Sequence, residues 1–174
     1  YIPNGMDLMH RSTGIHLAQF DLEADNYVLF LGRFSPEKNL DLLIQAFEGV
    51  DTPMKLVLAG GSSHTDEYVR ELRSHACDRI KFLDWLSGSA LQEVLTSAAL
   101  FVLPSDIEGL SLALLDAMGA GVCVLTSDVP ENFEVVGDAG FTFRAGNVLD
   151  LQRMLRTLLF NPELRQRTGE LARE

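Results

Sequence analysis

The segment DIEGLSLALLDAMGAGVCVLTSD, from Asp106 to Asp128, contains two carboxylates in positions that need an explanation. Glu108 stands just ahead of a small, apolar, helix-like stretch, and Asp116 lies about two turns into it. Asp is less favourable than Ala in a helix interior by roughly 0.6 kcal/mol. Both side chains could accept hydrogen bonds from hydroxyls, Glu108 from those of a sugar and Asp116 from those of a ribose. The alternative, a capping carboxylate and an outward-facing Asp, stays open on these residues alone.

The backbone between the two carboxylates suits an anion. Gly109 has no Cβ, so a ligand could come close to the chain there. The N–H groups of the next helix start have no partner within the helix, and such groups favour phosphate. The expected donors are the N–H groups of four consecutive residues, Gly109, Leu110, Ser111 and Leu112. A carboxylate beside a bound diphosphate would be repelled, so Glu108 is not expected to bind phosphate itself.

The loop GRFSPEKN contains two cations, Arg33 and Lys38, ahead of another expected helix. Cations at a helix N-terminus oppose the helix dipole, so their presence makes sense if an anion lies between them. Gly32 would let the chain leave its strand tightly, and Asn39 is a candidate cap for the helix. A solvated loop with two incidental cations remains the alternative.

The segment AGGSSHTDEY offers weaker signals. Gly61 and the glycine before it would permit close approach of a ligand to the backbone, or would simply form a turn. His64 is expected to be a surface loop residue rather than a catalyst. The two cysteines, Cys77 and Cys123, show no metal-ligand spacing and are interpreted as reduced, buried thiols of a cytosolic protein.

Alternating short apolar runs and helix-like segments must position these residues. The pattern begins at Tyr27 and predicts an α/β fold, a parallel sheet with helices on both faces. In such sheets ligands bind outside the carboxyl ends of the strands, where the strand order reverses. The expected strands are 27–32, 54–61, a strand and its exit within 79–86, then 99–105, 122–128 and 140–146. The expected helices are 40–50, 66–76, 89–98 with Ser89 as N-cap, 110–121, 131–138 and a helical end over 147–174. Residues 1–26, with the turn signal IPNG, are expected to be irregular.

Length and composition limit the function classes. The 174 residues are 47% hydrophobic and 22% charged, which suits one globular domain. The net charge of −11 argues against broad nucleic-acid binding. No apolar run reaches the roughly 18 residues of a membrane span, and the start has neither a signal peptide nor an initiator Met. A fragment or a processed product is therefore expected.

Three stretches, LGRFSPEKNLDLLIQAF, KLVLAGG and PSDIEGLSLALLDAMGAGVCVLTSD, together resemble the C-terminal, donor-binding domain of retaining glycosyltransferases of family 4, the glycosyl transferases group 1. The resemblance implies the GT-B fold, here a Rossmann-like three-layer α/β/α domain with a parallel sheet of about six strands. It covers nearly the whole chain, from IPNG, and residues 1–174 are interpreted as a single nucleotide-sugar-binding domain, with 1–26 as a linker-like start. The N-terminal acceptor domain would be absent.

The resemblance also implies roles for single residues. Arg33 and Lys38 match the cations that bind the diphosphate of the sugar donor, and Glu108 matches the first of two Glu residues of the family. Asp116 stands where the family has the second Glu, and it is assigned a contact with the ribose. No metal is implied, because the family typically needs none and the sequence has no Asp-x-Asp motif.

The expected function is the donor-binding half of a retaining glycosyltransferase, which moves a sugar from a nucleotide-sugar to a glycan or lipid-linked acceptor. UDP is the default nucleotide, no further cofactor is expected, and the location is expected to be cytoplasmic. Any membrane contact would be peripheral and through the absent domain, and the isolated chain is expected to transfer little or no sugar. The alternatives are a nucleotide-sugar epimerase or a synthase of related architecture, or a non-catalytic nucleotide-binding module.

Overall fold

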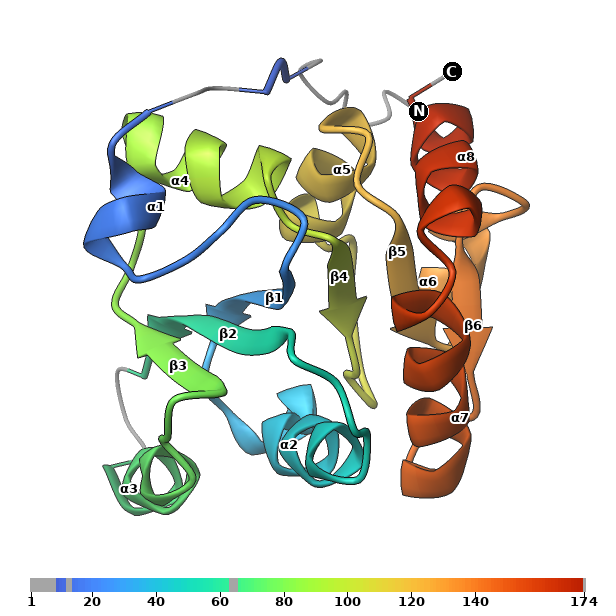
Figure 1. The fold of residues 1–174 in the computed structure, drawn as a ribbon. Helices are drawn as coiled ribbons and strands as arrows, with labels where there is room; N and C mark the ends of the chain where they lie inside the picture. The colour runs from blue at the N-terminus through green and yellow to red at the C-terminus, as the bar shows by residue number, and fades with distance from the viewer. Residues whose placement is uncertain (1–8, 12–13, 63–65, 174) are drawn as a thin grey trace.

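The computed structural model describes residues 9–11, 14–62 and 66–173, and its centre is a six-stranded, fully parallel sheet (Figure 1). The strands are β1 (Tyr27–Arg33), β2 (Lys55–Gly61), β3 (Ile80–Leu83), β4 (Leu100–Leu103), β5 (Val124–Ser127) and β6 (Phe141–Phe143). Their order across the sheet is β3-β2-β1-β4-β5-β6. The predicted α/β class and parallel sheet are therefore confirmed.

Helices cover both faces of this sheet. They are α1 (His16–Gln19), α2 (Leu40–Glu48), α3 (Asp66–Ser74), α4 (Gly88–Thr96), α5 (Leu112–Gly119), α6 (Pro130–Val136), α7 (Val148–Leu159) and α8 (Pro162–Ala172), with a 3₁₀ turn η1 (Pro36–Lys38). Figure 1 shows α2 and α3 on one side of β1–β3, and α1, α4 and α5 on the other. The late helix α7 packs against α2, and α8 packs against α5 and α7.

The burial of the central strands explains why they read as continuous apolar runs. The first four residues of β1, from Tyr27 to Phe30, are fully buried, and so is every residue of β4 apart from a trace of Leu103. Leu29 lies between Val57 of β2 and Phe101 of β4. A strand covered on both faces has no polar side to alternate with its apolar side.

The strand order places the reversal point beside β1. The chain moves outward from β1 to β2 and β3, and then returns to β4 on the other side of β1. The segments that follow β1 and β4 therefore leave the sheet side by side at its carboxyl edge. This is the position where sheets of this type bind ligands.

One prediction in the first part of the chain was wrong. The stretch 1–26 is not wholly irregular, because residues His16–Gln19 form the helix α1. The buried carboxylate of Glu93 accepts hydrogen bonds from the backbone N–H groups of His16 at 3.2 Å and Leu17 at 3.1 Å. A turn stabilised by a carboxylate 76 or 77 positions away leaves no local signal. The turn signal IPNG lies outside the described residues.

Two helix boundaries also differ from their predictions. Ser87, not Ser89, is the N-cap of α4, and the Ser89 hydroxyl instead lies 3.1 Å from Nε2 of His16. The helical end of the chain is divided in two at Asn161. The Asn161 side chain caps α8 by accepting the Leu164 N–H at 3.1 Å, and Pro162 follows in the first turn, where its missing N–H costs nothing.

Candidate functional site

Two glycines bring the strand ends of the carboxyl edge close together. Gly60 of β2 lies opposite Gly32 of β1, and a Cβ on Gly60 would lie only 1.8 Å from the carbonyl oxygen of Gly32. Gly60 also has φ +142°, and Gly32 has φ +153°, conformations that L side chains rarely adopt. Close approach at this edge is therefore built into the sheet, although the strand continues one residue beyond Gly32, to Arg33.

Three polar contacts join the loop after β1 to the loop after β4. The Asp106 N–H donates to the carbonyl of Glu37 at 3.0 Å, and Nδ2 of Asn39 donates to the carbonyl of Pro104 at 3.3 Å. The third contact is an ion pair in which Nζ of Lys38 lies 2.6 Å from Oε1 of Glu108. Two segments 70 positions apart thus form one polar site.

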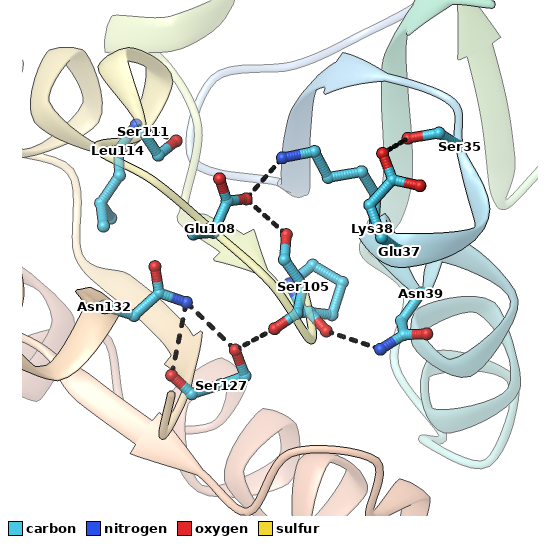
Figure 2. Close-up of polar contacts among 11 residues, drawn as sticks. Ser35, Glu37, Lys38, Asn39, Ser105, Glu108, Ser111, Leu114, Ser127 and Asn132 are labelled. Atoms are coloured by element: carbon cyan, nitrogen blue, oxygen red, sulfur yellow. Dashed lines mark hydrogen bonds and ion pairs between the residues drawn. The ribbon is translucent and has the colours of Figure 1, made fainter. Parts of the chain in front are cut away.

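The ion pair is the best-shielded charge contact at this edge. The Lys38 side chain is 16% exposed and that of Glu108 is 6% exposed. The hydroxyl of Ser105 also donates to Oε1 of Glu108 at 2.6 Å (Figure 2). The sequence suggested that both Lys38 and Glu108 belong to the site, but not that they contact each other directly.

The second predicted cation lies at the end of the same loop. Arg33 is the last residue of β1 and is exposed, whereas Lys38 closes η1. The exposed carboxylate of Glu37 lies between them in sequence. The Ser35 hydroxyl donates to it at 2.6 Å, and this hydrogen bond lowers the pKa of that carboxyl. Asn39 is the N-cap residue of α2, as predicted, but it is in the left-handed region and its side chain donates to the carbonyl of Pro104 instead of capping the helix.

The next segment begins its helix later than predicted. Helix α5 starts at Leu112, with Ser111 as N-cap, and the Ser111 hydroxyl accepts the Leu114 N–H at 3.4 Å. Gly109 and Leu110 therefore lie ahead of the helix. A Cβ on Gly109 would meet no atom within 4 Å, so no described part of the protein needs a glycine there.

Asp116 lines a small pocket that begins where β1 ends. The pocket has a volume of about 160 Å³ and is lined by Leu31, Gly32, Ala59, Trp85, Leu86, Leu91, Ala113 and Asp116. Apart from the carboxylate, its walls are apolar or aromatic. Sequence reasoning missed Trp85, which is 62% exposed although it is the largest side chain of the protein. Its place directly after a strand, in the segment LDWL, is the signal that could have identified it.

Gly61 lies on the other side of the same indole. A Cβ on Gly61 would lie 2.9 Å from Nε1 of Trp85, so this glycine lets the ring sit against the strand end. A larger, more open hollow of about 660 Å³ follows, and Arg70, Arg73 and Asp84 contribute to its wall. His64 lies outside the described residues.

The remaining candidates for chemistry are metal-binding clusters and the two cysteines. Within 9–11, 14–62 and 66–173, no group of three His, Cys, Asp or Glu side chains could hold a metal ion. Cys123 is buried, and burial raises the pKa of its thiol to about 12. The prediction of two buried thiols was wrong for Cys77, which is exposed after α3. Over the same described ranges, no helix has the length and apolar character of a membrane span.

Known proteins resemble this chain over most of its length. The family model described as "Glycosyl transferases group 1" matches residues 16–174. An O-antigen chain mannosyltransferase B of Escherichia coli is 34% identical over 130 residues, which are 71% of this chain and 34% of that protein. A phosphatidyl-myo-inositol mannosyltransferase of Mycobacterium leprae is 30% identical over 174 residues, 95% of this chain and 46% of that protein. The chain thus spans less than half the length of these two curated relatives.

Solved structures share the fold. HepE of Anabaena in complex with UDP superposes with a TM-score of 0.86 at 21% identity, over 98% of this chain and 50% of that one. The C-terminal domain of the group 1 glycosyl transferase LpcC of Francisella tularensis gives a TM-score of 0.78 at 17% identity, over 97% of this chain and 95% of that one. These likenesses support the three-layer fold, and the family follows from the sequence match. Because that match spans residues 16–174, the chain belongs to the glycosyl transferases group 1 family.

Proposed function

We propose that this domain binds the nucleotide-sugar of a glycosyltransferase at the carboxyl edge of its sheet. The observation that carries the proposal is the meeting of Lys38 and Glu108, from two separate loops, at the reversal of strand order. Membership of the glycosyl transferases group 1 family supports sugar transfer as the chemistry. The shared fold with a UDP-bound HepE supports UDP as the first nucleotide to test.

The diphosphate is assigned to Arg33, Lys38 and the backbone ahead of α5, from Gly109 to Leu112. Arg supplies a planar fork of donors, and Lys supplies a mobile point charge. Negative charge grows on the diphosphate as its bond to the sugar breaks. Fixed cations stabilise that charge more in the transition state than in the ground state, and this difference is catalysis.

The nucleoside is assigned to the small pocket of Asp116. Its apolar walls and the indole of Trp85 suit the faces of a base, and a carboxylate suits ribose hydroxyls. Gly61 allows the indole to lie close to the strand end. Asp116 is one methylene shorter than the Glu of the family pattern, and its place in the pocket wall supports the role inferred from the sequence.

Glu108 is assigned to the transferred sugar. Its carboxylate would orient sugar hydroxyls near the anomeric carbon, and by family resemblance the reaction would retain the anomeric configuration without a metal. In the structure Lys38 is bound to Glu108. Engaging the diphosphate therefore requires Lys38 to turn at least partly away from this carboxylate.

We further infer that residues 1–174 act as one donor-binding domain in a cytoplasmic enzyme. The acceptor would be bound by a second domain across the cleft, because the curated relatives are about two to three times as long as their matched parts. The chain by itself is then expected to bind the nucleotide-sugar and to transfer little or no sugar.

Calorimetric titration with UDP, uridine and pyrophosphate tests the proposal. UDP should bind much more tightly than uridine. Charge-assisted contacts are worth about 1.5–3 kcal/mol each, so Arg33→Ala and Lys38→Ala should each weaken UDP binding by at least about tenfold. Lys81→Ala is the matched control, since Lys81 is a cation in β3 paired with Asp21, away from the proposed site. Equal UDP affinity of the wild type and the Arg33→Ala/Lys38→Ala double variant would refute the site.

A further inference from the structure

Glu108 is held through one of its two carboxylate oxygens. Lys38 Nζ and Ser105 Oγ both donate to Oε1, each at 2.6 Å. Among the described residues none donates to Oε2, which points away from both donors in Figure 2. The carboxylate therefore has a fixed oxygen and a second oxygen left for another partner.

The two donors on Oε1 differ in how firmly they are placed. Lys38 reaches Glu108 with a four-carbon stem from an exposed turn, and its ammonium can rotate to other acceptors. Ser105 has a one-carbon side chain and is a fully buried residue two positions after β4. The mobile ammonium of Lys38 can leave Oε1 when an anion binds nearby. The short, buried side chain of Ser105 cannot move to that anion.

A chain of hydrogen bonds fixes Ser105 in turn (Figure 2). The Ser127 hydroxyl donates to the carbonyl oxygen of Ser105, and Nδ2 of Asn132 donates to the Ser127 hydroxyl at 3.0 Å. These three residues are at most 1% exposed. They come from three segments, the end of β4, the end of β5 and the first turns of α6, so the position of Ser105 is set by the packing of the sheet and α6.

We propose that Ser105 is the positioning residue of Glu108, with Ser127 and Asn132 as its support. This inference rests on the proposed function. Lys38 and Ser105 are both donors to Oε1. When Lys38 turns to the diphosphate, Ser105 keeps the carboxylate in place, with Oε2 directed to the sugar. The lost ion pair would otherwise leave Glu108 free to rotate at the moment when its orientation matters.

A double-mutant cycle in the intact protein that carries this domain tests the inference. Ser105→Ala should lower kcat with UDP-sugar by about tenfold, the value of one charge-assisted hydrogen bond, and should change the KM for UDP-sugar much less. In the Glu108→Gln background, where the charge is already absent, the same change should lower kcat by less than about twofold. Ser97→Ala is the matched control, because Ser97 is an equally buried serine after α4 and away from the site.

The outcomes separate this inference from the function on which it rests. Equal losses in both backgrounds would assign Ser105 a merely structural role, and an unchanged kcat would deny it any role. If Glu108→Gln itself keeps wild-type turnover, the proposed catalytic carboxylate is refuted instead.

Crystal structures with bound UDP test the role of Ser105 without an activity assay. In the wild type Glu108 should keep its contact with Ser105 while Lys38 contacts the diphosphate. In Ser105→Ala the Glu108 carboxylate should turn away, and an unmoved carboxylate in that variant would overturn the inference.

Discussion

Lys–carboxylate pairs lie at both ends of the sheet. They differ far more in the burial of their side chains than in the distance between their charged atoms. At the carboxyl edge Lys38 lies 2.6 Å from Glu108, with side chains 16% and 6% exposed. Ahead of β1, Asp21 lies 2.7 Å from Lys55 and 2.9 Å from Lys81, but its own side chain is 74% exposed. The contact distance alone would rank the three pairs as equals.

The difference in burial shows which of these ion pairs costs the fold desolvation free energy. Removing two charges from water is expensive, and their mutual attraction often fails to repay it. Water already solvates Asp21, so its pairs cost little and contribute little. The shielded pair of Lys38 and Glu108 stands at the reversal of strand order, where ligands bind, so a structural reason for it is weaker than a functional one.

The largest expected effect on stability is that of Lys38→Ala. This change leaves the shielded Glu108 with Ser105 as its remaining donor, so the free energy of unfolding should fall by about 1–3 kcal/mol. Lys81→Ala at the exposed pair should lower it much less. Denaturant unfolding monitored by circular dichroism measures both. Equal losses for the two variants would break the comparison, since burial would then have no energetic consequence.

Asp116 sharpens the comparison with a carboxylate of intermediate burial. If it contacts the ribose, Asp116→Asn should reduce the preference for UDP over 2′-deoxy-UDP several-fold, about 1 kcal/mol for one hydrogen bond. Pyrophosphate affinity should stay unchanged. Calorimetric titration of the two nucleotides and pyrophosphate gives all three numbers. A change confined to pyrophosphate would place Asp116 at the phosphates instead of the nucleoside.

Asp116→Glu is the matched variant, because it restores the residue of the family pattern without changing the charge. Binding of UDP should be kept or improved. A large loss would mean that the pocket beside Trp85 is shaped for the shorter side chain.

The fold was predictable because each central strand of the sheet has a recognisable local sequence pattern. Runs such as those from Tyr27 and from Leu100 are apolar throughout, as buried parallel strands must be. The helix α1, which was missed, is four residues long and is capped by Glu93 from far along the chain. Its stability comes from a tertiary contact that no local pattern records.

The sequence predicted which loops carry the candidate residues, but not how those residues contact one another. Glycine, lysine and carboxylate types marked the loops after β1 and β4, and Lys38 and Glu108 do meet there. That Lys38 pairs with Glu108, and that Asn39 turns from its helix to Pro104, depends on how two loops lie in space. Buried supports such as Ser127 carry no signal in sequence, because a serine within a strand is equally compatible with many roles.

The smallest effect on stability is expected for the exposed carboxylate of Asp21, and it can be measured through its dependence on pH. Hydrogen bonds from Lys55 and then from Lys81, with their charges, lower the pKa of Asp21 from its ordinary value of 3.8 to about 2. A carboxyl with a lowered pKa stabilises the fold fully above its unfolded pKa, and loses that contribution as the pH falls through the folded pKa. The contribution of Asp21 should therefore be complete above pH 3.8 and should vanish near pH 2.

Asp21→Asn isolates this contribution from that of all other carboxylates. The residue has φ +54°, a conformation that Asn tolerates, so the variant removes the charge without straining the backbone. The difference in thermal midpoint between wild type and variant should be small and constant near neutral pH, and should disappear on acidification between about pH 4 and pH 2. It should also shrink in about 1 M salt, because an exposed pair is screened. A large difference that persists in high salt would make Asp21 as well shielded as Glu108, and burial could then no longer explain why the two ends of the sheet differ.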